Sequence, residues 1–213
     1  AEHALDAAPV TRRRGGALTI ARAPARASAP HLCRLQAAQL RAGDRVLMRE
    51  IDVCVQRDTR LHISGPNGAG KSTLLRAIER AVSLPREQLL VLPQELGEAA
   101  CRALLERIRA LGPGERGQLL ALAARLGLAP SRLLDSQLPS PGEARKLCLA
   151  EGLSREVALV LLDEPENHLD LPALERLEQC LAEYQGALVL VTHDEALAQT
   201  LCDQRLEVSR DTT

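Results

Sequence analysis

A glycine-rich segment followed by a lysine and a serine carries the residue types needed to bind phosphate. Residues 65–72 match the phosphate-loop pattern GxxxxGK[ST]. The glycines let successive backbone N–H groups face one anion, and the helix expected after them adds a positive N-terminal end. Lys71 can then reach the β- and γ-phosphates of a nucleotide, and Ser72 can place its hydroxyl on Mg²⁺. The predicted phosphate loop comprises Gly65, Pro66, Asn67, Gly68, Ala69, Gly70, Lys71 and Ser72.

Two adjacent acidic residues after an apolar run form the second chemical signal. Residues 159–164 read Leu-Val-Leu-Leu-Asp-Glu, the pattern of a buried strand that ends in acids. In an open α/β sheet, ligands bind at the carboxyl ends of the strands. We therefore expect Asp163 to hold Mg²⁺, directly or through water, and Glu164 to polarise the attacking water as general base. Two acids after a strand often only begin a helix, and their pairing with the phosphate loop is what favours a Walker B motif.

Apolar periodicity predicts the elements that must position these residues. Alternation and short apolar runs indicate strands, and helical spacing indicates helices between them. The expected strands are 32–40, 46–55, 60–64, 89–92, 157–162, 187–191 and 204–208, and the expected helices are 72–82, 98–111, 118–126, 142–153, 172–184 and 195–201. Strands that alternate with helices predict an α/β domain with a largely parallel sheet and a small helical insert.

Composition places the chain among ordinary globular domains. Its 213 residues are 46% hydrophobic with a net charge of −1, so the overall charge does not indicate nucleic acid. No apolar run approaches the roughly 20 residues of a membrane span, and no secretory signal is recognisable, so we expect a cytoplasmic protein without direct membrane insertion. Six scattered cysteines without a CxxC pair indicate neither a zinc site nor a redox motif. Residues 1–30, rich in Ala, Pro and Arg, are predicted to be a flexible linker or a basic arm that contacts RNA.

Two compositional biases bear on the site. The chain has no Phe or Trp and one Tyr, so Leu, Ala, Val and Ile must build its core. Its basic residues are nearly all arginine, and Lys71 and Lys146 are the exceptions. A lysine in the phosphate loop fits a position that needs a compact point charge on a flexible stem.

With these motifs in this order, residues 31–213 resemble the ATP-binding cassette (ABC) family. The resemblance implies a P-loop NTPase fold with a mostly parallel core sheet, N-terminal antiparallel strands and a helical subdomain at about residues 95–152. It implies ATP and Mg²⁺ as ligands, with Gln94 as the Q-loop glutamine on Mg²⁺ and water and His193 as the switch histidine on the γ-phosphate. Residues 140–143 resemble the signature motif LSGGQ, which serves ATP held by an opposing cassette. To the nucleotide site the resemblance adds Thr73, Ser140, Gly142 and Asp170, the last in the D-loop at the seam between cassettes.

The stretch from Asp163 to Asp170 narrows the resemblance to the ABC-F proteins. It is similar to their DEPTNHLD run, with Glu166 in place of Thr. The short interval from Lys71 to Gln94 also suits them better than importer or exporter cassettes. The resemblance implies the C-terminal cassette of a two-cassette protein, with a second cassette and the ribosome or its RNA as partners. It further implies ATP hydrolysis that needs both cassettes and serves translation or antibiotic resistance.

Several residues depart from the family pattern, and two other functions stay open. Ala42 stands where the family usually has an aromatic that stacks on adenine, which predicts weak base discrimination and reduced nucleotide affinity. Pro139, Pro141 and Glu143 replace the usual signature residues, and Pro141 removes a backbone N–H that could face phosphate. The alternatives are the ATP-binding subunit of a transporter and a non-hydrolysing regulatory module that binds ATP.

Overall fold

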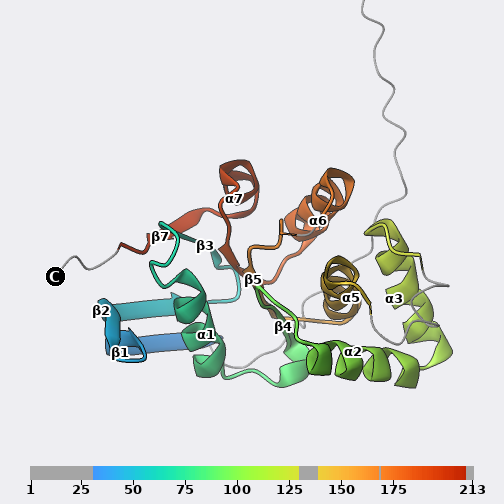
Figure 1. Cartoon of the computed structure of the whole chain (residues 1–213), viewed down its shortest axis with the longest axis horizontal. Helices are drawn as coiled ribbons and strands as arrows, with labels where there is room; N and C mark the ends of the chain where they lie inside the picture. Colours follow the sequence, from blue (N-terminus) through green and yellow to red (C-terminus); the bar gives the residue numbers. More distant parts are fainter. Residues whose placement is uncertain (1–30, 130–138, 168, 210–213) are drawn as a thin grey trace, which may run out of the picture.

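The computed structural model describes residues 31–129, 139–167 and 169–209, which form two sheets and the helices around them (Figure 1). The first sheet is an antiparallel hairpin of β1 (Cys33–Ala42) and β2 (Arg45–Val55). The expected linker, residues 1–30, lies outside the described residues.

The second sheet is parallel throughout and has the strand order β4-β5-β6-β3-β7. Its strands are β3 (Arg60–Ser64), β4 (Leu89–Leu92), β5 (Leu159–Asp163), β6 (Ala187–Val191) and β7 (Gln204–Glu207). Every residue of β5 and β6 is buried, as their continuous apolar runs predict for strands covered on both faces. The predicted fold class, a mostly parallel core sheet with an N-terminal antiparallel hairpin, is therefore confirmed.

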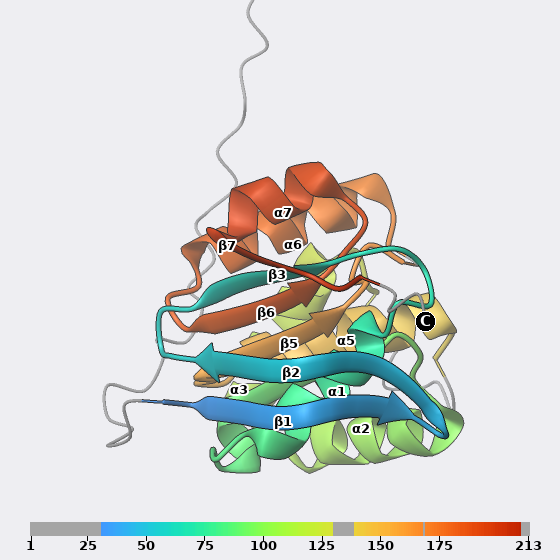
Figure 2. The ribbon, with the colours of Figure 1, turned by 90° about the vertical axis from the view of Figure 1, so that its left-hand side faces the viewer.

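Helices cover both faces of the parallel sheet (Figures 1 and 2). Helix α1 (Lys71–Ala81) packs between the hairpin and the central strands. The remaining helices are α2 (Glu98–Ala110), α3 (Pro113–Arg125) and α5 (Pro141–Leu153), which gather beside β4, then α6 (Leu171–Glu183) and α7 (Glu195–Leu201), with the short η1 (Arg86–Gln88) leading into β4. No helix in the described ranges is long and apolar enough to cross a membrane.

Alternating side chains of β5 divide the core into two clusters. Leu159 and Leu161 pack with α1 and the hairpin, whereas Val160 and Leu162 pack with helices α2, α3, α5 and α6. Both clusters therefore pack against the strand that ends in Asp163, and they fix the position of its carboxyl end.

Two of the helices that begin earlier than the sequence predicts begin at a proline. Helix α3 begins at Pro113 rather than at residue 118, and α5 begins at Pro141 rather than at residue 142. Proline is tolerated in the first turn of a helix because the N–H it lacks would have no helical partner there. The Gly-Pro-Gly segment at residues 112–114, which lies between the expected helices 98–111 and 118–126, thus forms the N-terminus of α3, where the Gly112 N–H donates to Oε2 of Glu115 at 3.3 Å.

Candidate active site

The predicted phosphate loop connects β3 to α1. Gly65, Gly68 and Gly70 have φ angles of +142°, +74° and +106°, which residues with side chains rarely adopt. Space is limiting as well, since a Cβ on Gly65 would overlap the carbonyl oxygen of Val208 and one on Gly70 would lie 2.9 Å from the Leu47 side chain. The loop therefore needs glycine for its conformation and for its packing.

Lys71 is 5% exposed and reaches back across the loop. Its Nζ atom donates to the carbonyl oxygens of Gly65 at 3.0 Å and Pro66 at 3.3 Å, and it lies 3.2 Å from Nε2 of His193. An ammonium group has three donors, so these contacts hold it between the loop and the end of β6. The structure thus brings the predicted phosphate-binding lysine and the predicted switch histidine together.

The end of β5 supplies oxygen ligands next to the loop. Asp163 is 3% exposed, and its Oδ1 atom is buried without a hydrogen-bond partner among the described residues. Burial raises the pKa of this carboxyl group, and a hydrogen bond with Ser72 opposes that rise. A buried carboxylate oxygen without a partner, beside a hydroxyl, fits Mg²⁺, which prefers oxygen ligands and keeps several waters. Asp163 and Ser72 are therefore the residues that could hold the metal.

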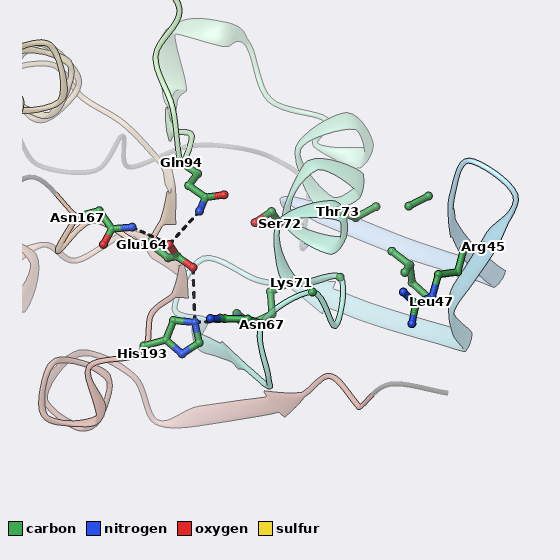
Figure 3. Close-up of a pocket in the computed structure, with 13 residues that line it drawn as sticks. Arg45, Leu47, Asn67, Lys71, Ser72, Thr73, Gln94, Glu164, Asn167 and His193 are labelled. Atoms are coloured by element: carbon green, nitrogen blue, oxygen red, sulfur yellow. Dashed lines mark hydrogen bonds and ion pairs between the residues drawn. The ribbon is translucent and has the colours of Figure 1, made fainter. Parts of the chain in front are cut away.

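Glu164 is the centre of a hydrogen-bond cluster (Figure 3). Its φ of +48° is uncommon for a residue with a side chain, and backbone outliers of this kind cluster at functional sites. Its Oε2 atom accepts from Nδ2 of Asn167 at 2.7 Å and from Nε2 of Gln94 at 3.1 Å, while Oε1 lies 3.6 Å from Nε2 of His193. The three residues predicted to be catalytic therefore meet. Asn167 joins them, although its sequence context alone did not predict a role for it. Its position three residues after Glu164 is the signal that could have identified it.

Glu166 holds the segment that carries His193. Its Oε1 atom accepts from Oγ1 of Thr192 at 2.7 Å and from the backbone N–H of His193 at 3.0 Å. The residue that departs from the DEPTNHLD run is thus built into the site, because a carboxylate reaches both donors at once.

Arg145 is a site residue that the sequence did not reveal. It is 1% exposed, and its two terminal nitrogens donate to the carbonyl oxygens of Pro93 at 2.7 Å, Gln94 at 2.6 Å, Asp163 at 3.1 Å and Glu164 at 2.7 Å. Desolvation lowers the pKa of this guanidinium, and the nearby carboxylates oppose that shift. One side chain of α5 therefore ties the Gln94 loop to the end of β5. The sequence feature that could have identified Arg145 is its place as an arginine among the apolar residues of this helix.

The residues predicted from the signature motif lie outside this cluster. Ser140 caps α5, where its Oγ donates to Oε2 of Glu143 at 2.7 Å and accepts from the Glu143 N–H at 3.4 Å. Glu143, a departure from the usual Gln, thus completes a capping box. Asp170 precedes α6 and accepts from Nζ of Lys146 at 2.6 Å. The structure does not bring Ser140, Gly142 or Asp170 to the cavity that the phosphate loop and Glu164 line in this chain.

One cavity of about 650 Å³ joins the loop, the cluster and the hairpin. Its size lies within the range of small-molecule sites, roughly 300–1,000 Å³. The lining residues are Ala42, Arg45, Leu47, Asn67, Gly68, Gly70, Lys71, Ser72, Thr73, Gln94, Glu164, Asn167 and His193. Gly65, Pro66 and Ala69 complete the loop without lining the cavity.

Comparison with known proteins identifies a family and several relatives. The sequence profile of the ABC transporter family matches residues 48–167. The chain is 39% identical over 158 residues to the tylosin resistance ATP-binding protein TlrC of Streptomyces fradiae, covering 70% of this chain and 29% of TlrC. It is 30% identical over 192 residues to the ribosome protection protein VmlR of Bacillus subtilis, covering 79% and 32%. ABC transporter F family member 2 of Arabidopsis thaliana is 30% identical over 182 residues, with coverages of 78% and 26%. The chain thus spans about a third of the length of these relatives.

Solved structures share the fold. An ATP binding subunit of an ABC transporter superposes with a TM-score of 0.67 at 22% identity, covering 84% of this chain and 88% of that one. The dimeric post-hydrolysis structure of the ATP-binding cassette MJ0796 bound to ADP and Pi gives a TM-score of 0.64 at 18% identity, with coverages of 85% and 95%. At these identities the similarity concerns the fold alone, and it agrees with the predicted P-loop NTPase cassette.

Proposed function

Because the chain belongs to the ABC transporter family of ATP-binding cassettes, we propose that it binds ATP with Mg²⁺ and hydrolyses the bond to the terminal phosphate. One observation carries the proposal: Lys71, Gln94, Glu164 and His193 come from four separate segments and meet at one cavity. A phosphate loop alone would support binding only. A carboxylate held beside that loop by two amide donors supports activation of a water molecule as well.

Phosphate binding is the task of the loop and its lysine. The backbone N–H groups at the start of α1 and the ammonium of Lys71 bind the β- and γ-phosphates. Asp163 and Ser72 would hold Mg²⁺, which supplies neutralisation of charge on the phosphate oxygens. Thr73 lines the same cavity one residue further along α1.

Proton transfer is the task of the cluster around Glu164. The carboxylate accepts a proton from the attacking water, and Gln94 and Asn167 hold it in orientation through their hydrogen bonds to Oε2. His193 contacts the γ-phosphate from the end of β6, where Glu166 fixes its backbone. Each of these groups is positioned by an element of the parallel sheet.

A second cassette completes the proposed site. Ser140, Gly142 and Asp170 lie away from this chain's own cavity, so we assign them to ATP held by an opposing cassette. Such an arrangement pairs two chains or two cassettes head to tail, and each helix α5 then points its N-terminus at the partner's nucleotide. Hydrolysis should accordingly depend on cassette pairing.

The proposed biological setting is the ribosome in the cytoplasm. TlrC is a tylosin resistance protein, and VmlR is a ribosome protection protein. We propose that this cassette serves an ABC-F type protein in translation or antibiotic resistance, as the C-terminal cassette of a longer chain. ATP-dependent co-sedimentation with ribosomes would support this setting, and stable co-purification with membrane subunits would support a transporter instead.

The hydrolysis proposal is tested by replacing the general base. Glu164→Gln keeps the shape and the Asn167 neighbour, and it should lower ATP turnover by at least about 100-fold while ATP binding persists. Turnover is measured over a series of protein concentrations, because a site shared between two cassettes gives a rate that rises faster than linearly. Glu87→Gln, on η1 and away from the nucleotide cavity, is the matched control. Unchanged turnover in Glu164→Gln would refute the assignment.

A further inference from the structure

The two ends of the nucleotide cavity differ in chemistry. Glu164 and His193 stand at one end, Lys71 and the phosphate loop lie in the middle, and the hairpin residues Arg45 and Leu47 stand at the other end (Figure 3). If the terminal phosphate of a nucleotide faces Glu164, as the proposed function requires, its base must extend toward the hairpin. The base is flat and needs a flat or apolar surface to lie on.

No aromatic side chain in the described part of the chain provides that surface. The sequence has no Phe and no Trp, and its single Tyr is Tyr184. Tyr184 is 2% exposed, and its hydroxyl donates to the carbonyl oxygen of Val157 at 3.2 Å. Its ring is therefore part of the core and does not face the cavity. The histidine that lines the cavity, His193, stands at the opposite end. The platform for the base must therefore be something other than an aromatic ring.

We propose that the guanidinium of Arg45 stacks on the nucleobase in place of an aromatic ring. A guanidinium is planar, delocalised and weakly hydrated, so it stacks on aromatic faces as an ammonium group cannot. Arg45 is the first residue of β2, pairs across the hairpin with Ala42 and is exposed. Within the described ranges its side chain has no hydrogen-bond or ion-pair partner. The small side chain of Ala42 leaves open the space where a ring would otherwise stand.

The neighbouring groups explain why Arg45, rather than another residue, takes this role. Arg41 on the same hairpin is already engaged, since it donates to Oε1 of Gln39 at 3.3 Å and to the carbonyl oxygen of Asp44 at 2.7 Å. Leu47 is 7% exposed and packs against the phosphate loop, so little of its side chain is left for a base to lie on. Because every base has a π-face, stacking on Arg45 predicts similar affinity for adenine and guanine nucleotides.

The test separates the base contribution from the phosphate contribution by calorimetric titration. AMP-PNP, GMP-PNP and inorganic tripolyphosphate are titrated into the purified chain with Mg²⁺. The two nucleotides should bind within a few-fold of each other and roughly 5- to 150-fold more tightly than tripolyphosphate. Arg45→Ala and Arg45→Lys should both collapse this ratio toward one, because lysine keeps the charge but lacks the plane. Ala42→Tyr added to Arg45→Ala should restore the ratio, and Arg34→Ala, an exposed change elsewhere on the hairpin, should leave it at the parent value.

Each opposite result overturns a defined part of the reasoning. If the parent chain binds tripolyphosphate as tightly as AMP-PNP, or if Arg45→Lys keeps the parent ratio, the stacking role is wrong while the phosphate site stands. This inference rests on the proposed function, so a parent chain that binds neither AMP-PNP nor tripolyphosphate would overturn both. Thermal unfolding of the Arg45 variants should match the parent, because the side chain is exposed.

Discussion

Removing Arg145 should damage the site and the stability of the domain together. Its guanidinium bonds four backbone carbonyls that belong to two separate segments, the Gln94 loop and the end of β5. In Arg145→Met these acceptors, one buried and three partly buried, lose their donors, at about 1–3 kcal/mol for each one left unsatisfied. The avoided desolvation of a buried cation offsets several kcal/mol of that loss. We expect a net loss of roughly 3 kcal/mol in the free energy of unfolding, or about 6–12 °C in melting temperature.

Urea denaturation followed by circular dichroism measures that loss. Arg145→Lys separates the structural role from the positioning role, because it keeps a buried charge but cannot bridge four carbonyls with one planar group. It should therefore retain more stability than Arg145→Met and still lower kcat, with little change in the affinity for ATP. Arg155→Lys, just beyond the C-terminal end of the same helix and paired with Glu151, is the control and should change stability by less than about 0.5 kcal/mol. A midpoint for Arg145→Met equal to that of the parent would refute the reasoning.

Three further predictions concern the loop, the histidine and the thiols. Gly65→Ala should abolish nucleotide binding and destabilise the fold, because the new Cβ would overlap a backbone carbonyl at a φ of +142°; a nucleotide titration with a parent-like result would contradict this. Glu166→Ala removes the acceptor for the His193 N–H, so kcat should fall by roughly tenfold with ATP affinity retained, and an unchanged kcat would contradict it. Burial raises the pKa of Cys33 and Cys148 from 9.0 to about 11, so both favour the neutral thiol when folded. Their stabilising effect is complete below pH 9 and is lost as the pH rises toward 11. Above pH 9 the free energy of unfolding should therefore fall more steeply with rising pH in the parent than in a Cys33→Ala, Cys148→Ala double variant. Equal slopes of free energy against pH in the two proteins would count against this prediction.

Local patterns are enough to predict the phosphate loop and the strand that ends in acids. The loop at Gly65 depends on backbone freedom and a following helix, and both are properties of neighbouring residues. The buried strand before Asp163 is likewise recognisable from its own apolar run. The parallel order of the sheet then brings Asp163 and His193 to the same edge, because β5 and β6 pair directly.

Contacts between distant segments cannot be predicted in the same way. Arg145 reaches Pro93 across 52 positions, and no local pattern says which face of an apolar helix an arginine will bury. The start of α3 at Pro113 differs from the prediction because a Gly-Pro-Gly segment indicates a break as readily as a helix N-terminus. Arg45 becomes significant only when the cavity places it across from the cluster around Glu164.

A structure of the Glu164→Gln chain with ATP and Mg²⁺ would test the central claim most directly. The claim predicts the terminal phosphate within hydrogen-bond distance of Lys71 Nζ and His193 Nε2. It also predicts that the amide introduced at position 164 faces a water in line with that phosphate, and that the base lies beside the hairpin. A nucleotide bound elsewhere, or a terminal phosphate far from all three side chains, would contradict it.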